Sequence, residues 1–297
     1  MARVVVTGKI PQVALESLRQ AHDVLAWEES SPISRAELLT RVKGADALVT
    51  LLTEKVDGEL LDAAGPQLKS VSNVAVGYNN IDVPACTQRN VIVTNTPGVL
   101  TDATADIAMA LILMVTRRLA EGERVIRSQT PWQWGMFYML GSGIQGRQLG
   151  IVGMGQIGIA TARRAKAFGM TIAYTKRSPL DAATAKELDA THMDMDQLLA
   201  TSDVVSLHCP YSPETHHLIS TEQLKKMKPT AFLINTARGP VVDEAALVEA
   251  LTSCTISGAG LDVFEKEPEV HAGLLGLDNA VLIPHLGSAT VETRTAM

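Results

Sequence analysis

The stretch "LGIVGMGQIG", from Leu149 to Gly158, decides the fold of the second half of the chain. An apolar strand pattern leads into the glycine pattern G-x-G-x-x-G, and a helix pattern follows at once. In this context Gly153 permits a tight turn, Gly155 lets the backbone approach a pyrophosphate, and Gly158 lets the helix lie close to the sheet. The stretch therefore predicts a dinucleotide-binding turn.

The residues around this turn narrow the choice of cofactor. The backbone N–H groups of Gln156 and Ile157 open the helix and are expected to point at phosphate. The next strand, "MTIAYT", leads into Lys176, Arg177 and Ser178, where an acidic residue would bind the ribose 2′-hydroxyl of NAD. A turn with cations and a hydroxyl suits a 2′-phosphate instead. NADP(H) is therefore favoured, and NAD(H) is the alternative.

Strand-length apolar runs alternate with helix-length amphipathic segments in both halves of the chain. The runs are "RVVV", "ADALVT", "SVSNVAV" and "VIVTN" before the glycine turn, and "MTIAYT", "DVVSLH", "AFLINT" and "SGAGLDV" after it. Ser34 and Ser220 begin two of the helices, with Glu37 and Gln223 at capping-box spacing. Such alternation predicts an α/β protein with parallel sheets covered by helices on both faces. A length of 297 residues favours two such domains.

A long apolar segment, "TPGVLTDATADIAMALILMVTRR", lies between the two halves. After Pro97 and Gly98 it is expected to form one helix, with its apolar surface buried against another domain or another subunit. The next stretch, "TPWQWGMFYMLGSG", is irregular and rich in aromatic residues. It is either a packed loop or a functional one.

The overall composition limits the partners. The net charge is −6 without a basic stripe, which argues against nucleic acid. The three cysteines, Cys86, Cys209 and Cys254, have no metal-site spacing, so no metal is expected. The start "MARVVVTGKI" lacks the pattern of a signal peptide, and the longest apolar run is too short to cross a bilayer. We expect a soluble cytoplasmic protein without a membrane partner.

The residues able to do chemistry follow later strands, in "INTARGPVVD", "GAGLDVFEKEPEV" and "LIPHLGSAT". Ligands of open parallel sheets gather at the carboxyl ends of strands. Arg238 can hold a carboxylate and polarise a carbonyl, and His285 can give a proton to oxygen as hydride reaches carbon. A carboxylate such as Glu267 beside the histidine favours its protonated form. Each residue alone also suits a surface, turn or capping role, but their combination with a dinucleotide turn favours catalysis.

Six motifs, spread over nearly the whole chain, resemble signatures of the D-isomer-specific 2-hydroxyacid dehydrogenases, and most closely of the glyoxylate/hydroxypyruvate reductases among them. The motifs are "VGYNNIDV", "NTPGVLTDATADIA", "GIVGMGQIG", "INTARG", "GLDVFEKEP" and "PHLGSAT". The resemblance implies a Rossmann-like cofactor domain, residues 100–286, inserted into a flavodoxin-like substrate domain, residues 1–99 and 287–297. It also implies that a C-terminal helix of the relatives is missing, with lower stability or a more mobile substrate domain than in a full-length relative.

The resemblance assigns roles to single residues. Arg238 would bind the carboxylate and keto oxygen of a small 2-keto acid. His285 would be the general acid in reduction and the base in oxidation, and Glu267 would keep it protonated for reduction. The backbone N–H groups of Val76 and Gly77 would hold the substrate carboxylate.

Further residues would border the cofactor or the subunit interface. Besides the glycine turn and the turn formed by Lys176, Arg177 and Ser178, the resemblance gives five more cofactor neighbours. They are Thr104, Thr236, Asp262, Gly287 and Ser288. The resemblance also implies a homodimer in which Trp134 reaches into the partner's substrate site and favours small substrates. The chain departs from the family's usual sequence at two places. Gln156 stands where the family usually has an arginine, and Met136 stands where it often has a proline.

The implied activity is NADPH-preferring reduction of glyoxylate or hydroxypyruvate to glycolate or D-glycerate. One alternative is another D-2-hydroxyacid dehydrogenase, acting on a bulkier or phosphorylated keto acid, although the "VGYNNID" loop contains no cation for a phosphate. A second alternative is a non-catalytic NAD(P)-sensing scaffold, like the transcriptional corepressors that share this fold. A third is an inactive remnant.

Overall fold

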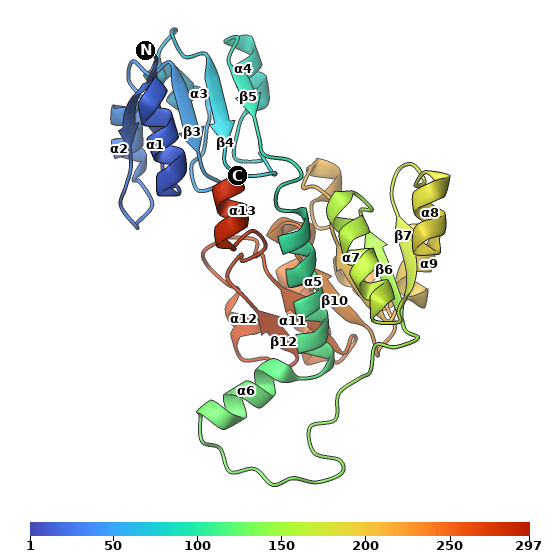
Figure 1. The fold of residues 1–297 in the computed structure, drawn as a ribbon. Coiled ribbons are helices and arrows are strands. Elements are labelled where there is room, and N and C mark those ends of the chain that lie inside the picture. The colour runs from blue at the N-terminus through green and yellow to red at the C-terminus, as the bar shows by residue number, and fades with distance from the viewer. The chain divides into compact units, whose positions relative to one another are not determined.

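Two α/β units make up the chain in the computed structural model, which describes residues 1–297 (Figure 1). Unit 1 consists of Met1–Leu100 and Ala289–Met297, and unit 2 of Thr101–Ser288. Unit 2 is therefore inserted into unit 1 along the sequence. No helix is both long enough and apolar enough to cross a membrane.

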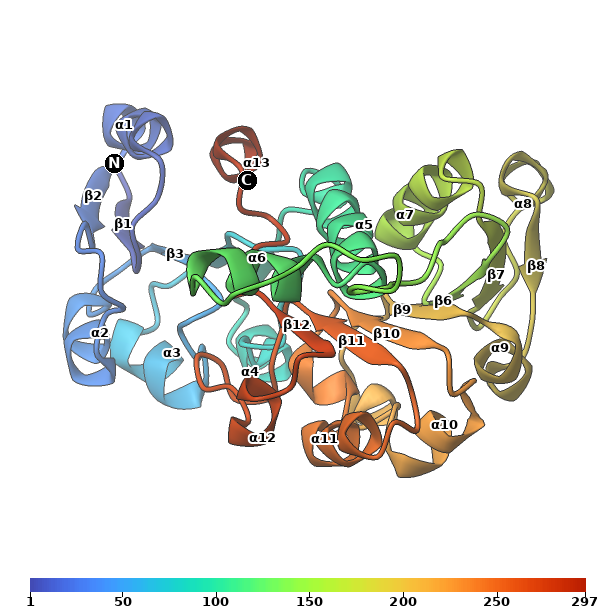
Figure 2. The ribbon, with the colours of Figure 1, turned by 90° about the horizontal axis from the view of Figure 1, so that it is seen from below.

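Unit 1 is built on a five-stranded parallel sheet in the order β2-β1-β3-β4-β5. Its elements are β1 (Arg3–Val6), α1 (Gln12–Ala21), β2 (Asp23–Ala26), α2 (Arg35–Arg41), β3 (Ala47–Thr50), α3 (Gly58–Ala64), β4 (Ser70–Asn73), α4 (Val83–Gln88), β5 (Ile92–Thr94) and α13 (Val291–Ala296). Leu15 of α1 packs on Val4 and Val6 at one face, while α2, α3 and α4 cover the other (Figure 2).

Unit 2 is built on a seven-stranded parallel sheet in the order β12-β11-β10-β9-β6-β7-β8. Its strands are β6 (Gln148–Val152), β7 (Thr171–Thr175), β8 (Ala190–His192), β9 (Val204–Leu207), β10 (Phe232–Asn235), β11 (Gly258–Leu261) and β12 (Ala280–Leu282). Its helices are α5 (Thr101–Thr116), α6 (Leu119–Arg127), α7 (Gln156–Ala167), α8 (Ala182–Leu188), α9 (Met195–Thr201), α10 (Thr221–Lys226), α11 (Glu244–Thr252) and α12 (Ala272–Leu275), with the short 3₁₀ turns η1 (Pro213–Thr215) and η2 (Gly239–Val241).

Helices cover both faces of this larger sheet. α5 and α7 lie on one face, and α9, α10 and α11 on the other (Figure 2). Strands β9, β10 and β11 are consequently buried at every position. The two helix starts expected from capping residues are confirmed, because Ser34 accepts a hydrogen bond from the N–H of Glu37 and Ser220 forms a capping box with Gln223.

The apolar segment between the two halves forms α5, as expected, but it packs within its own unit. Leu111, Ile112 and Val115 of α5 share one core cluster with Ile151 and Ile234 of the sheet. The expectation that another domain or subunit covers this helix is therefore wrong for these side chains. The sheet of unit 2 already buries them.

The strand order of unit 2 reverses between β6 and β9. Strands β7 and β8 lie on one side of β6, and β9, β10, β11 and β12 lie in this order on its other side. In open parallel sheets, ligands bind beyond the carboxyl ends of the strands at such a switch point. The glycine turn directly follows β6 and therefore lies at this position.

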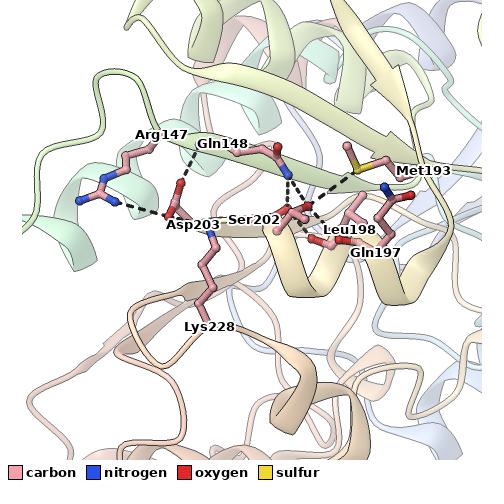
Figure 3. A network of polar contacts seen from close by, with 9 residues as sticks. Arg147, Gln148, Met193, Gln197, Leu198, Ser202, Asp203 and Lys228 are labelled. Carbon is pink, nitrogen blue, oxygen red and sulfur yellow. Dashed lines mark hydrogen bonds and ion pairs between the residues drawn. The ribbon is translucent and has the colours of Figure 1, made fainter.

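A polar network around Asp203 holds the opposite, amino-terminal edge of the sheet (Figure 3). The Asp203 carboxylate accepts a hydrogen bond from the N–H of Gln148 at 2.9 Å and pairs with Lys228 at 3.0 Å and Arg147 at 3.6 Å. Burial alone would raise the pKa of Asp203, but these contacts outweigh burial and lower it. Since Gln148 begins β6 and Asp203 precedes β9, the network joins the two strands at the switch point.

Candidate active site

The glycine turn after β6 has the geometry that its spacing predicts. Gly153 has a φ of +93°, and a Cβ there would lie 2.5 Å from the backbone nitrogen of Cys209. A Cβ on Gly158 would lie 2.7 Å from the carbonyl oxygen of Gly153. At Gly155 the corresponding space is open. The first and last glycines therefore permit the turn and the helix packing, and the middle one leaves room for a pyrophosphate.

The N-terminus of α7 lacks a side-chain cap, unlike most helices of the chain. Its N-cap is Gly155, which has no side chain to accept a hydrogen bond. Side chains cap the starts of other helices, at Ser34, Asp57, Asp82, Asp181, Asp194, Asp243 and Thr290. The first N–H groups of α7, at Gln156 and Ile157, are thus left for an external acceptor. With the helix dipole, this arrangement fits the phosphates of a dinucleotide.

The turn after β7 presents the three residues expected at a 2′-phosphate. Arg177 and Ser178 are exposed and Lys176 is half-buried. The carbonyl oxygen of Lys176 lies 3.2 Å from Nε2 of His192, at the end of β8. This turn contains no acidic residue that could accept a hydrogen bond from a ribose 2′-hydroxyl.

Arg238 lies in a tight turn after β10 that Asn235 stabilises. Asn235 is 1% exposed, and its Nδ2 donates to the Arg238 carbonyl while its Oδ1 accepts from the N–H of Ala237, both at 3.0 Å. Burial lowers the pKa of Arg238, and the charge of Glu267 opposes that shift. Asn235 was not predicted from the sequence as a positioning residue. The sequence feature that could have indicated it is an asparagine at the end of a strand and before a turn. In that position the side chain of asparagine often forms hydrogen bonds with the backbone of the turn.

Glu267 and His285 form a close hydrogen-bonded pair, although they come from separate loops. Glu267 Oε2 lies 2.7 Å from His285 Nδ1, and Glu267 Oε1 accepts a hydrogen bond from the N–H of Phe264 at 3.0 Å. Burial of Glu267 favours the neutral acid, but the contact with His285 outweighs burial and lowers the pKa of Glu267. The pair fixes the imidazole through Nδ1, which leaves Nε2 for proton exchange with a ligand.

The backbone that carries His285 is held in an unusual conformation. His285 has a φ of +52°, in the left-handed region that few residues other than glycine adopt. The buried Asp262 carboxylate accepts hydrogen bonds from the N–H groups of Leu286 at 2.5 Å and Gly287 at 2.8 Å, and Thr104 donates to the Gly287 carbonyl at 3.0 Å. Residues held in this way cluster at active sites. Asp262 and Thr104 thus fix the histidine loop, and their contact with a cofactor stays a prediction.

Thr236 and Ser288 complete the predicted cofactor neighbours. Thr236 is 7% exposed, and its hydroxyl lies 3.5 Å from Nδ1 of His208. Nε2 of the same ring lies 2.9 Å from the hydroxyl of Ser206. Burial lowers the pKa of His208 to about 4, so this ring is neutral at neutral pH. His208 was not predicted from the sequence, although its place directly after β9 is the position where such residues gather. Ser288 is half-buried.

The remaining predicted residues lie elsewhere in the two units. Val76 and Gly77 belong to unit 1, in the loop after β4, and their N–H groups donate no hydrogen bond within the chain. Such N–H groups can bind an anion. Trp134 belongs to unit 2, in the irregular segment after α6, and is 77% exposed.

Comparison with known proteins places this arrangement in a family. Residues 109–287 match the family described as D-isomer specific 2-hydroxyacid dehydrogenase, NAD binding domain. A glyoxylate reductase from Thermococcus onnurineus is 50% identical over 300 residues, which cover 99% of this chain and 89% of the relative. The crystal structure of a glyoxylate reductase from Paecilomyes thermophila is 35% identical with a TM-score of 0.89, covering 99% of this chain and 90% of that one.

A further solved structure includes ligands. It is an NADPH-dependent glyoxylate/hydroxypyruvate reductase from Sinorhizobium meliloti in complex with NADP and malonate. It is 35% identical with a TM-score of 0.85, and the match covers 99% of this chain and 89% of that one. These matches confirm the resemblance and the two-sheet fold class expected from the sequence. The chain therefore belongs to the D-isomer specific 2-hydroxyacid dehydrogenases, which are NAD(P)-dependent oxidoreductases.

Proposed function

We propose that the protein is an NADPH-preferring reductase that converts glyoxylate or hydroxypyruvate to glycolate or D-glycerate. The observation that carries this proposal is the Glu267–His285 pair at 2.7 Å. It supplies a proton donor held by a carboxylate, and the charge of Arg238 acts on the same carboxylate. The names of the relatives support the choice of glyoxylate.

In the proposed reaction, each residue acts on a defined part of the substrate. Arg238 binds the carboxylate and keto oxygen and so polarises the carbonyl. Bound NADPH supplies the hydride that adds to the keto carbon. His285 gives its Nε2 proton to the keto oxygen as negative charge develops there, and Glu267 stabilises the imidazolium before the transfer. In the oxidation direction His285 takes the hydroxyl proton as a base.

The substrate carboxylate is bound by backbone donors in this proposal. The N–H groups of Val76 and Gly77 have no acceptor within the chain, and a carboxylate can accept from both. The "VGYNNID" loop lacks a cation, which favours a small monocarboxylate over a phosphorylated keto acid.

The proposed preference for NADPH rests on the turn after β7. Replacing Arg177 with alanine is expected to raise the KM for NADPH by roughly 10- to 100-fold, because a charge-assisted hydrogen bond is worth about 1.5–3 kcal/mol. The KM for NADH should barely change, since NADH has no 2′-phosphate. Arg163→Ala, which removes an exposed arginine paired with Glu187, is the matched control. Equal losses with both cofactors would contradict the assignment.

We further propose that the segment after α5 builds a homodimer. α6 buries none of its residues, and the segment that follows extends from the body of unit 2 (Figure 1). Its exposed apolar side chains are Leu119, Ile126, Trp132, Trp134, Met136, Phe137, Tyr138 and Leu140. Eight exposed apolar side chains within one segment of the sequence favour an interaction surface over a face left to solvent. Trp134 would then reach the partner's substrate site and narrow it.

The double variant Phe137→Asp/Leu140→Asp is expected to be a monomer of 31.7 kDa by light scattering, whereas the unmodified chain should have twice that mass. Placing two charges in an apolar interface opposes association, because each must lose its hydration. Val13→Asp, at an exposed apolar position of α1, is the control and should stay dimeric. A monomeric unmodified chain would overturn the proposal.

The proposed reaction is tested by the loss of NADPH absorbance with glyoxylate and then with hydroxypyruvate. Rapid turnover with either substrate supports the proposal, and the ratio of the two rates selects the substrate. Turnover only with bulkier or phosphorylated keto acids would favour a different 2-hydroxyacid dehydrogenase. NADPH binding without any turnover would favour a sensing scaffold instead.

A further inference from the structure

The loop after β4 is held by three consecutive carbonyl groups. Each carbonyl accepts one hydrogen bond from the end of β4 or β5: Ala75 from the N–H of Thr96 at 2.9 Å, Val76 from Nδ2 of Asn95 at 2.8 Å, and Gly77 from Nδ2 of Asn73 at 2.9 Å. Ala75 is 3% exposed and Val76 and Gly77 are half-buried, and all three of their carbonyls are satisfied by protein donors rather than left to water, which indicates a built arrangement.

Fixing these carbonyls also fixes the neighbouring N–H groups. In a planar trans peptide, the C=O and N–H bonds point in opposite directions, and the chain's cis peptide lies elsewhere. The anchored carbonyls therefore direct the N–H groups of Val76, Gly77 and Tyr78 away from their anchors. None of these three N–H groups donates to another group of the chain. Successive N–H groups without an acceptor can bind an anion where the backbone turns them to a common side.

The anchor at Asn73 is itself buried and fully bonded. Asn73 is 1% exposed, and besides the loop carbonyl its Nδ2 reaches Oδ1 of Asn80 at 3.2 Å. Its Oδ1 accepts from the hydroxyl of Thr50 at 3.0 Å. Asn80 in turn donates to the carbonyls of Leu51 and Glu54, each at 3.0 Å. A satisfied buried network of this kind holds one geometry, so the loop is pre-organised before any ligand binds.

Asn95 differs from Asn73 in a way that makes it testable. It is half-buried and follows the short strand β5, and its side chain reaches the loop through Nδ2 alone. Removing this side chain frees one carbonyl, which water can then reach. The fold should therefore tolerate the loss of Asn95 far better than the loss of Asn73.

We propose that Asn95 and Asn73 are positioning residues that orient the backbone N–H groups of Gly77 and Tyr78 toward a substrate carboxylate. The N–H of Tyr78 is then a third donor beside those of Val76 and Gly77. The choice of a 2-keto or 2-hydroxy carboxylate as the ligand rests on the proposed function. The orientation of the donors rests only on the contacts within unit 1.

The test compares the full chain with its Asn95→Ala variant, using oxalate as an unreactive carboxylate. Oxalate should shift the amide NMR signals of Val76, Gly77 and Tyr78 in the unmodified chain. In Asn95→Ala, the Kd of oxalate and the KM of glyoxylate should rise roughly five- to tenfold together, as for one weakened hydrogen bond to a charged ligand. The kcat and the Kd of NADPH should change by less than about twofold.

Asn279→Ala is the matched control, because Nδ2 of Asn279 also donates to a single carbonyl, that of Leu251 at 3.2 Å, but in unit 2. It should leave the oxalate Kd unchanged. Unchanged oxalate and glyoxylate constants in Asn95→Ala would overturn the proposal, and so would an equal loss of NADPH affinity. A chain that fails to reduce glyoxylate, yet binds oxalate more weakly after Asn95→Ala, would refute the proposed reaction and support the positioning role.

Discussion

Replacing His285 with alanine is expected to lower kcat for glyoxylate reduction by roughly 10²- to 10⁴-fold, the usual contribution of a positioned general acid. Without this imidazole, the keto oxygen must take its proton from water as hydride adds. NADPH binding should persist, because the His285 side chain bonds to Glu267 and not to the glycine turn or the N-terminus of α7. Steady-state kinetics together with a fluorescence titration of NADPH separates the two effects.

A matched histidine shows whether the loss is specific. His22→Ala changes a side chain at the end of α1 that has no hydrogen-bond partner at Nδ1. It should leave kcat within about twofold of the unmodified chain. A loss in His285→Ala no larger than in His22→Ala would remove His285 from the mechanism, provided that both variants melt at similar temperatures.

The variant Glu267→Gln tests the Glu267–His285 pair through the pH dependence of kcat/KM. Glutamine keeps an acceptor for Nδ1 of His285 but removes the negative charge that favours the imidazolium. Glutamine does not titrate, so the acid limb of kcat/KM that protonation of Glu267 produces in the unmodified chain should be absent from the variant. A lower rate with an unchanged pH profile would mean that Glu267 only orients the ring. In the unmodified chain, the pKa of Glu267 is lowered, so this carboxylate stays ionised at pH values below the usual pKa of a glutamate. The contact with His285 is therefore lost only as pH falls through that lowered pKa.

The glycine turn could be predicted from the sequence because its geometry is local. Three glycines at fixed spacing, after a strand and before a helix, leave few backbone conformations. The positive φ of Gly153 and the close approach of Gly158 to the Gly153 carbonyl follow from the same short stretch. The fold class followed in the same way from alternating periodicities, and α5 followed from its length and apolar content.

The loop that carries His285 could not be predicted from local pattern. Thr104 and Gly287 are 183 positions apart, and Asp262 bonds to backbone 24 and 25 positions further on. From the sequence, Asp262 is expected just after a strand as a neighbour of the cofactor. The structure places both of its oxygens on backbone N–H groups, and only the long-range register of β11 and β12 brings those groups near.

Two edge strands also escaped the apolar pattern. β2 and β8 have four and three residues, and neither contains a fully buried one. Each pairs with a single neighbouring strand, β2 with β1 and β8 with β7. The apolar residues of β2, Val24, Leu25 and Ala26, are only partly buried, and Thr191 and His192 of β8 are exposed, so neither strand has the burial that makes an apolar run easy to recognise.

Replacing Arg238 with alanine is expected to lower kcat/KM for glyoxylate by roughly 10²- to 10⁴-fold, because two hydrogen bonds to a charged ligand are worth about 1.5–3 kcal/mol each. The variant should have both a higher KM and a lower kcat. The contact with the carboxylate contributes to KM, and the contact with the keto oxygen strengthens as charge develops there and contributes to kcat. The turn itself should persist, since Asn235 holds the carbonyl of residue 238 and the N–H of Ala237 rather than the guanidinium.

Two further experiments, the variant Arg238→Lys and the addition of free guanidinium, separate the contribution of the positive charge of Arg238 from that of its planar guanidinium group. Lysine keeps the positive charge but cannot bind a carboxylate through two parallel N–H groups, so it should recover only a small part of kcat/KM. Free guanidinium should partly restore Arg238→Ala, because it can occupy the space left by the side chain. Full activity in Arg238→Lys would show that a point charge suffices. An alanine variant no worse than Arg163→Ala would mean that another group binds the substrate, and the proposed reaction geometry would have to be abandoned.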